Sequence, residues 1–177
     1  MLRYARNDVT SVGFSGYVPN NLSNDWDVEL CHSLLHDTIN VHFDTLFDLK
    51  DSEIYQHFCG TIIYRKAIDY HGTDGACTVS TILDLGLVEG VSEVFVNGQS
   101  AGVRYFGHRQ YDISKLLQKG VNEIEIRVIT TMGNYLKTLS REENLTTWIY
   151  VNHPKRDQPL QPMGLIGPVR LYHIEQP

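Results

Sequence analysis

The sequence predicts an all-β fold, a β-sandwich or jelly roll, and three observations favour this class. Asn97-Gly98 lies between two alternating runs and suits both positive-φ positions of a type I′ hairpin turn. From Ile124 to Val128, apolar residues alternate with Glu and Arg, as in a strand with one buried face. About eight or nine such short runs, separated by turn residues, span the chain. The sequence shows no pattern of long amphipathic helices, which argues against a βαβ architecture.

The strands before the hairpin are expected from the alternation of apolar and polar residues. They cover residues 26–30, 39–43, 61–69 and 78–85, with a loop and short helix at 46–55. The two-residue hairpin turn then sets the register of its own two strands. We expect the cross-strand pairs Val96–Gln99, Phe95–Ser100 and Val94–Ala101.

The chain after the hairpin is expected to form a capped helical turn, a long strand and a closing strand. Asp112 or Ser114 is a candidate cap for a short helix that stops at Gly120. Residues 146–151 are expected as a strand or an extended loop, 154–162 as irregular because of their prolines, and 169–173 as the last strand. We therefore expect a linker or leading segment at 1–25 and one jelly-roll domain at 26–177.

Length and composition indicate a globular chain with one hydrophobic core. Its 177 residues, 42% of them hydrophobic and 20% charged, fit a single domain. A net charge of −6, with no basic cluster longer than Lys155-Arg156, argues against nucleic acid as a partner. No apolar run is long enough to span a membrane, and the N-terminus lacks the apolar core of a secretory signal. The widely spaced Cys31, Cys59 and Cys77 suit neither a disulfide framework nor a metal motif.

Five motifs resemble those of a known family. They are Phe58-Cys-Gly-Thr-Ile-Ile-Tyr64, Leu83-Asp-Leu-Gly86, the hairpin from Glu93 to Gly102, the stretch from Tyr111 to Val128, and Gly164-Leu-Ile-Gly-Pro-Val169. In this order they are similar to the sugar-binding jelly roll of glycoside hydrolase family 2. They are closer still to the similar domain near the C-terminus of large rhamnosidase-like hydrolases.

This resemblance covers residues 26–174 and implies a galactose-binding-like sandwich that belongs to a longer hydrolase. Such a domain would be extracytoplasmic if its parent hydrolase is secreted or periplasmic. Cys59 stands where the family has Ser, and we expect it to be a small buried residue. Asn134-Tyr-Leu136 resembles the Asn-x-Leu segment that follows the family's long strand.

Catalysis is not expected from this chain by itself. Glycoside hydrolysis usually needs two carboxyl groups about 5–10 Å apart. The 21 acidic residues offer pairs such as Glu142-Glu143, but no recognisable motif surrounds any of them. In the resembling hydrolases the catalytic acids belong mostly to a (β/α)₈ barrel, which needs about 250 residues. The chain is therefore expected to be an accessory domain and not an enzyme.

Metal and cofactor binding has little support in the sequence. His32, His36 and His42 lack the close ligand spacing of a zinc site. The resemblance leaves a structural Ca²⁺ open, with Asp69, Asp74 and Asp84 as oxygen donors. No other cofactor is expected.

Sugar binding is the function that the resemblance favours. A pyranose stacks its apolar face on an aromatic ring while polar side chains bind its hydroxyls. Strand aromatics such as Trp26, Tyr64 and Phe95 are expected to be buried. The candidate sugar contacts therefore lie outside the expected core strands, and they are Tyr105, His108, Arg109, Tyr135 and Trp148, with Phe106 beside the first of them.

Two other functions compete with a carbohydrate-binding accessory domain. One is a purely structural sandwich that packs on a catalytic barrel and buries its loop aromatics there. The other is a free-standing sugar-active enzyme, which would need two carboxyl groups with shifted pKa values on a concave face. The expected partners are a carbohydrate and the catalytic domain of the parent chain, and neither nucleic acid nor a membrane is expected.

Overall fold

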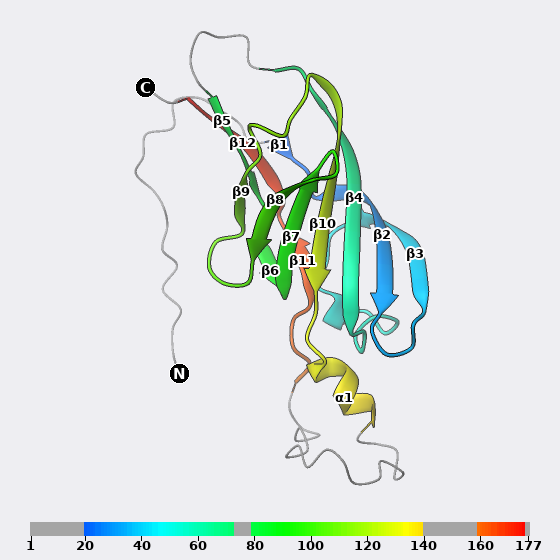
Figure 1. The fold of residues 1–177 in the computed structure, drawn as a ribbon. Coiled ribbons are helices and arrows are strands. Elements are labelled where there is room, and N and C mark those ends of the chain that lie inside the picture. The colour runs from blue at the N-terminus through cyan, green and yellow to red at the C-terminus, as the bar shows by residue number, and fades with distance from the viewer. Residues whose placement is uncertain (1–19, 73–78, 140–158, 176–177) are drawn as a thin grey trace.

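The computed structural model describes residues 20–72, 79–139 and 159–175, and within them it is a β-sandwich (Figure 1). The strands are β1 (Asn20–Asn21), β2 (Asn24–His32), β3 (Thr38–Thr45), β4 (Gly60–Tyr70), β5 (Val79–Asp84), β6 (Leu87–Glu89), β7 (Val91–Val96), β8 (Gln99–Arg104), β9 (Gln110–Asp112), β10 (Gly120–Ile129), β11 (Gly164–Gly167) and β12 (Arg170–Glu175). Two short helices accompany them, η1 (Leu49–Asp51) and α1 (Gly133–Leu139). The predicted all-β sandwich class is confirmed.

Two main sheets form the layers of the sandwich. The larger has six strands in the order β3-β2-β4-β10-β7-β8, and the smaller has four in the order β1-β12-β5-β9. A two-stranded ribbon of β11 and β6 continues below the smaller sheet, and α1 lies beyond the lower end of β10 (Figure 1). All strand pairs of the three sheets are antiparallel. Because β1 pairs with β12, the first and last strands of the described chain meet in one sheet.

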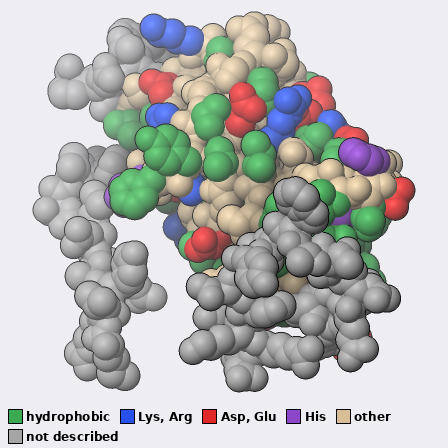
Figure 2. Space-filling view, turned by 60° about the horizontal axis from the view of Figure 1, so that its bottom comes forward, with side chains coloured by type: hydrophobic (Ala, Val, Ile, Leu, Met, Phe, Trp, Pro, Cys, Tyr) green, Lys and Arg blue, Asp and Glu red, His purple; other side chains and the backbone are tan. Residues whose placement is uncertain are grey.

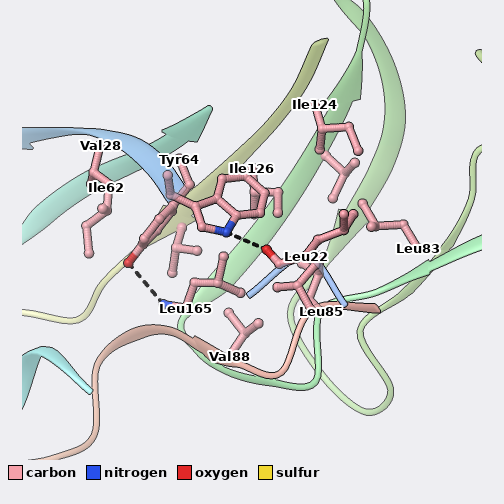
Figure 3. Close-up of a cluster of buried hydrophobic side chains, with 14 of the residues drawn as sticks. Leu22, Val28, Ile62, Tyr64, Leu83, Leu85, Val88, Ile124, Ile126 and Leu165 are labelled. Atoms are coloured by element: carbon pink, nitrogen blue, oxygen red, sulfur yellow. Dashed lines mark hydrogen bonds between the residues drawn. The ribbon is translucent and has the colours of Figure 1, made fainter. Parts of the chain in front are cut away.

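The core lies between the sheets, where the inward residue of each alternating pair is buried. β2 contributes Trp26, Val28 and Leu30 to it, and the facing sheet contributes residues such as Leu83 and Leu171. Two polar groups of buried aromatic side chains form hydrogen bonds within this core (Figure 3). The Trp26 Nε1–H donates to the Leu22 carbonyl at 2.7 Å, and the Tyr64 hydroxyl accepts from the Leu165 N–H at 3.1 Å.

The Asn-Gly turn forms as predicted, with φ values of 52° at Asn97 and 77° at Gly98. The predicted pairs Val96–Gln99 and Phe95–Ser100 are confirmed. The third pair is wrong, because a β-bulge shifts the register and places Gly102 opposite Val94 in place of Ala101. The expected burial of Phe95 is also wrong. Its ring is half-buried on the outer face of β7 beneath the Arg127 guanidinium, 4.4 Å from the ring centroid.

The segment from Asp112 to Gly120 is a turn and not the predicted short helix. The Asp112 carboxylate does act as a cap, since it accepts from the Ser114 N–H at 3.0 Å. Only Leu116 and Leu117 then donate back to the Ile113 carbonyl before the chain enters β10. Leu116 and Leu117 pack against the core, and the next N–H, of Gln118, donates to the Asn122 side chain at 2.8 Å and not to a helical carbonyl.

Most of the other elements expected from the sequence are present in the structure. The strands expected at 26–30, 39–43 and 61–69 and the short helix within 46–55 are present, and Cys59 is 1% exposed. The strand expected at 78–85 is present as β5, from Val79 to Asp84, and the one expected at 169–173 as β12, which starts at Arg170. Residue 78 lies outside the described part of the chain. Within the described residues, strand pairing is already present at Asn20, six residues before the expected first strand. Residues 146–151 lie outside the described part of the chain.

The Gly60 position explains the Phe-Cys-Gly-Thr motif. A side-chain carbon there would lie 2.1 Å from the Cys31 carbonyl oxygen, and φ is +154°. Only glycine therefore lets β4 begin so close to the end of β2.

Candidate functional site

The loop between β8 and β9 carries three of the predicted site residues. It leaves β8 after Arg104, turns at Gly107 with φ +73°, and enters β9 at Gln110. Its tip exposes 80% of Tyr105 and 85% of Phe106, and His108 is also exposed. Figure 2, which brings the lower end of the molecule forward, shows hydrophobic side chains exposed among charged ones. The loop therefore offers two aromatic faces next to an imidazole.

The base of this loop is held by two arginines. The Arg104 guanidinium lies over the Tyr111 ring, 5.3 Å from its centroid. Arg109 is only 8% exposed, and its Nη2 donates to the Gly90 carbonyl at 2.9 Å. Its Nη1 is buried and has no hydrogen-bond partner within the described residues. Arg109 thus binds the loop to Gly90, directly before β7. The predicted contact of Arg109 with a sugar stays a prediction.

Tyr135 lies at a different place from Tyr105. It is half-buried on α1, with its ring centroid 5.1 Å from that of His32 at the end of β2. β2 and β8 are separated by four strand spacings in the larger sheet. At about 4.8 Å per spacing this is on the order of 19 Å, which is too far for one sugar ring to touch both tyrosines. Trp148 lies outside the described residues.

The outer face of the larger sheet carries a shallow hollow of about 350 Å³, lined by Asp27, Val28, Glu29, Asn40, Val41 and Arg65. Arg65 binds Glu29 at 2.8 Å and Glu125 at 2.7 Å. The hydrogen bond from Arg65 lowers the pKa of Glu29. Burial acts to raise the pKa of Glu125, but hydrogen bonds from Arg65 and Arg127 outweigh it and lower that pKa. These carboxylates are held in the ionised form, the opposite of what a general acid requires.

The predicted metal donors do not assemble in the described part of the chain. Both Asp84 oxygens already accept hydrogen bonds, from the Gly86 N–H and the Gln110 amide, each at 2.9 Å. Across residues 20–72, 79–139 and 159–175, no three His, Cys, Asp or Glu side chains are grouped to hold a metal. Asp74 lies outside these ranges. The described residues therefore do not fit the Ca²⁺ site.

A smaller and more enclosed pocket of about 240 Å³ lies between the end of β6, the start of α1 with the residue Thr131 before it, and the segment before β11. Seven residues line it: Glu89, Gly90, Thr131, Asn134, Gln161, Pro162 and Met163. They come from three stretches far apart in the sequence, and none belongs to a motif that suggests a ligand. Sequence reasoning missed this pocket for that reason.

In comparisons with known proteins, most of the chain is similar to a part of longer proteins. No family model matches it. The rhamnosidase from Novosphingobium sp. PP1Y is 31% identical with a TM-score of 0.74, over 97% of this chain and 16% of the rhamnosidase. A Formosa agariphila protein with the provisional name beta-glucuronidase is 26% identical over 86% of this chain and 15% of its own length. This chain resembles one domain of larger glycoside hydrolases.

More distant structures show the same fold. An FMN-binding beta-glucuronidase from Facaelibacterium prausnitzii L2-6 has a TM-score of 0.58 at 17% identity, and the match covers 89% of this chain and 22% of that one. The chain thus matches between 15% and 22% of the lengths of these relatives.

No helix in the described ranges is long and apolar enough to cross a membrane.

Asn134, the Asn of the Asn-x-Leu segment, has a structural role in this chain. Asn134 is 3% exposed, and its amide bonds to the Gln161 backbone in both directions, each at 2.8 Å. It fixes the segment that precedes β11 against α1. The motif therefore shapes one wall of the smaller pocket.

Proposed function

We propose that the chain is a non-catalytic carbohydrate-binding domain of a larger glycoside hydrolase, of the galactose-binding-like type. The observation that carries this proposal is the 31% identity over 97% of the chain, which matches only 16% of a rhamnosidase. A segment of that size is one domain, and a (β/α)₈ barrel of about 250 residues does not fit in it. The lowered pKa values of Glu29 and Glu125 support a role other than acid catalysis.

The tip of the β8–β9 loop supports the carbohydrate-binding part of the proposal. Tyr105 and Phe106 are among the most exposed aromatic side chains of the described residues, at 80% and 85%. Aromatic faces held clear of the surface can stack on the C–H face of a pyranose, and His108 can bind its hydroxyls. Holding glycan beside a catalytic domain acts through effective concentration, so weak binding is sufficient.

A second candidate is a structural domain that docks on the rest of its hydrolase and binds no sugar. The same exposed aromatics favour it, because large exposed apolar side chains often mark protein interfaces. The two candidates differ in one property that can be measured on this chain alone, which is stabilisation by free sugar.

The test is a thermal-shift screen against monosaccharides, including rhamnose and galactose, and plant oligosaccharides, with and without Ca²⁺. A ligand at a hundred times its Kd adds about 2.7 kcal/mol of stability, a rise of a few degrees in Tm. The double variant Tyr105→Ala/Phe106→Ala should weaken binding about tenfold, because each ring contact contributes about 0.5–1.5 kcal/mol. The matched control is Ile54→Ala/Val121→Ala, whose side chains are 79% and 75% exposed elsewhere. A panel without any shift would favour the structural domain.

A further inference from the structure

The pocket between Glu89, Thr131 and Met163 has the properties of a site for one sugar ring. Its volume of about 240 Å³ lies below the range of about 300–1,000 Å³ that holds drug-sized ligands. A single ring is therefore the unit that suits it, and a longer glycan would have to extend out of it.

The walls of this pocket are fixed before any ligand arrives. The Met163 N–H donates to Asp48 Oδ1 at 3.0 Å, and the Met163 carbonyl accepts from the Leu49 N–H at 3.1 Å. Asn134 holds Gln161 by two bonds of 2.8 Å. Walls of this kind lose little conformational freedom on binding.

Gly90 completes the wall on the side of β6. A side-chain carbon at Gly90 would lie 2.5 Å from the Ile129 carbonyl, and φ is +132°. The close approach of β7 to the end of β10 thus needs glycine at this position.

The rim of the pocket offers two exposed hydrogen-bonding groups that no other described residue binds. Within residues 20–72, 79–139 and 159–175, neither the Glu89 carboxylate nor the Thr131 hydroxyl has a partner. The preceding residue, Thr130, does have a partner, because its hydroxyl accepts a hydrogen bond from the Gly60 N–H at 2.9 Å. Met163 and Pro162 add apolar surface. An apolar wall beside an exposed carboxylate and an exposed hydroxyl suits the C–H face and the hydroxyls of a pyranose.

The charge of the pocket restricts which sugar suits it. Glu89 is the one formally charged residue among its seven lining residues, and the chain carries a net charge of −6. A uronic acid would place a second carboxylate beside Glu89, and none of the seven lining residues is a cation, while the Arg109 guanidinium behind the wall already donates to the Gly90 carbonyl, so the pairing of two carboxylates is unfavourable. We propose that this pocket binds the ring of a neutral pyranose through Glu89 and Thr131 and discriminates against uronic acids. This inference rests on the proposed carbohydrate-binding function and assigns it a second contact, apart from the β8–β9 loop.

The test is a titration of the ¹⁵N-labelled chain with the methyl glycosides of rhamnose, glucose and glucuronic acid, followed by amide chemical shifts. We expect the two neutral glycosides to shift the amides of Gly90, Thr131 and Gln161 and to bind at least tenfold more tightly than the glucuronide. Glu89→Gln should reduce that preference severalfold, because it removes the repelling charge and keeps a polar group. Thr131→Val should weaken neutral-sugar binding about threefold to tenfold. The controls Glu123→Gln and Thr45→Val make the same chemical changes at exposed positions outside the pocket and should leave binding unchanged.

Three results would overturn the proposal and can be told apart. Shifts confined to Tyr105–His108 would leave carbohydrate binding intact and reject the pocket. Equal affinity for the glucuronide would reject the role of Glu89. A wild-type chain whose amides do not respond to any glycoside would reject the pocket together with the carbohydrate-binding function on which it rests.

Discussion

Asn122 connects the Asn-Gly hairpin to the turn before β10 through hydrogen bonds of its side chain. It occupies an inward position of β10 and is fully buried. Its Nδ2 donates to the carbonyls of Gln118 and Gly120, at 2.7 and 2.8 Å. Its Oδ1 accepts from the Gln118 N–H and from the Asn97 side-chain amide, both at 2.8 Å. One side chain thus joins the 113–120 turn to the Asn-Gly hairpin.

Asn122→Ala is expected to destabilise the protein by about 2–4 kcal/mol, because it leaves several buried polar groups of the turn and the hairpin without partners. The free energy of unfolding from urea denaturation measures this effect. Asn40→Ala removes an exposed amide from β3 and should change stability by less than about 0.5 kcal/mol. Equal losses in the two variants would show that the Asn122 bonds contribute nothing beyond an ordinary surface amide.

The sequence predicted residue roles where the chemistry is local. Positive φ at Asn97-Gly98 follows from the backbone preferences of those two residue types alone. The bond between Asn97 and Asn122 joins residues 25 positions apart, and no local pattern reveals it. No local pattern distinguishes Thr131, whose hydroxyl has no partner among the described residues, from Thr130, whose hydroxyl accepts a hydrogen bond from the Gly60 N–H.

At the scale of the elements, Arg65 joins three neighbouring strands of the larger sheet. It lies on β4 and forms ion pairs with Glu29 of β2 and Glu125 of β10. Arg127, which is also on β10, forms a second ion pair with Glu125 at 2.7 Å. Glu125 is directly opposite Arg65 and Glu29 is diagonal to it, and both kinds of cross-strand pair contribute to the stability of a sheet. Arg65 itself is 36% exposed, so its ion pairs are weaker than fully buried ones.

These ion pairs predict a dependence of stability on pH. The pKa values of Glu29 and Glu125 are lower in the folded chain than the value of about 4.3 in the unfolded one. The unfolded chain then binds more protons, so this stabilisation is present above that value and is lost as pH falls through the folded pKa values. Arg65→Met should cost about 1–2 kcal/mol at pH 7, and the difference from wild type should shrink as pH falls below about 4.

Urea denaturation from pH 7 to pH 3 measures this loss. Lys119→Met removes the same charge from an exposed position and should show neither the loss nor its pH dependence. A difference between Arg65→Met and wild type that stays constant over the whole pH range would contradict the role given to the carboxylates.

Element prediction from the sequence failed where packing overrides local preference. Alternation identified the two faces of β2, β4 and β10 because one face of each strand is buried. The cap at Asp112 was predicted, but the helix after it was not continued. The β-bulge beside Phe95 was not predicted, since it depends on how β8 pairs with β7.

At the scale of the whole molecule, strands from both ends of the described chain meet in the smaller sheet. β1 and β12 pair although they lie near opposite ends of the described chain, and β12 is flanked by β1 and β5. Such long-range pairing cannot be read from local sequence patterns, although the sandwich class itself can. Because the inner faces of both sheets share one core, we expect them to unfold together.

Leu171→Ala tests this coupling from the smaller sheet. Leu171 is 3% exposed on β12, and truncation of a buried leucine costs about 2–5 kcal/mol. If the sandwich is one cooperative unit, far-UV circular dichroism and intrinsic fluorescence will report a single transition at a lower denaturant concentration. Val121→Ala, at a site that is 75% exposed on the larger sheet, should leave the midpoint almost unchanged. If the fluorescence and circular-dichroism transitions of Leu171→Ala do not coincide, the sandwich does not unfold in one step, and the shared core does not couple the two layers into one unit.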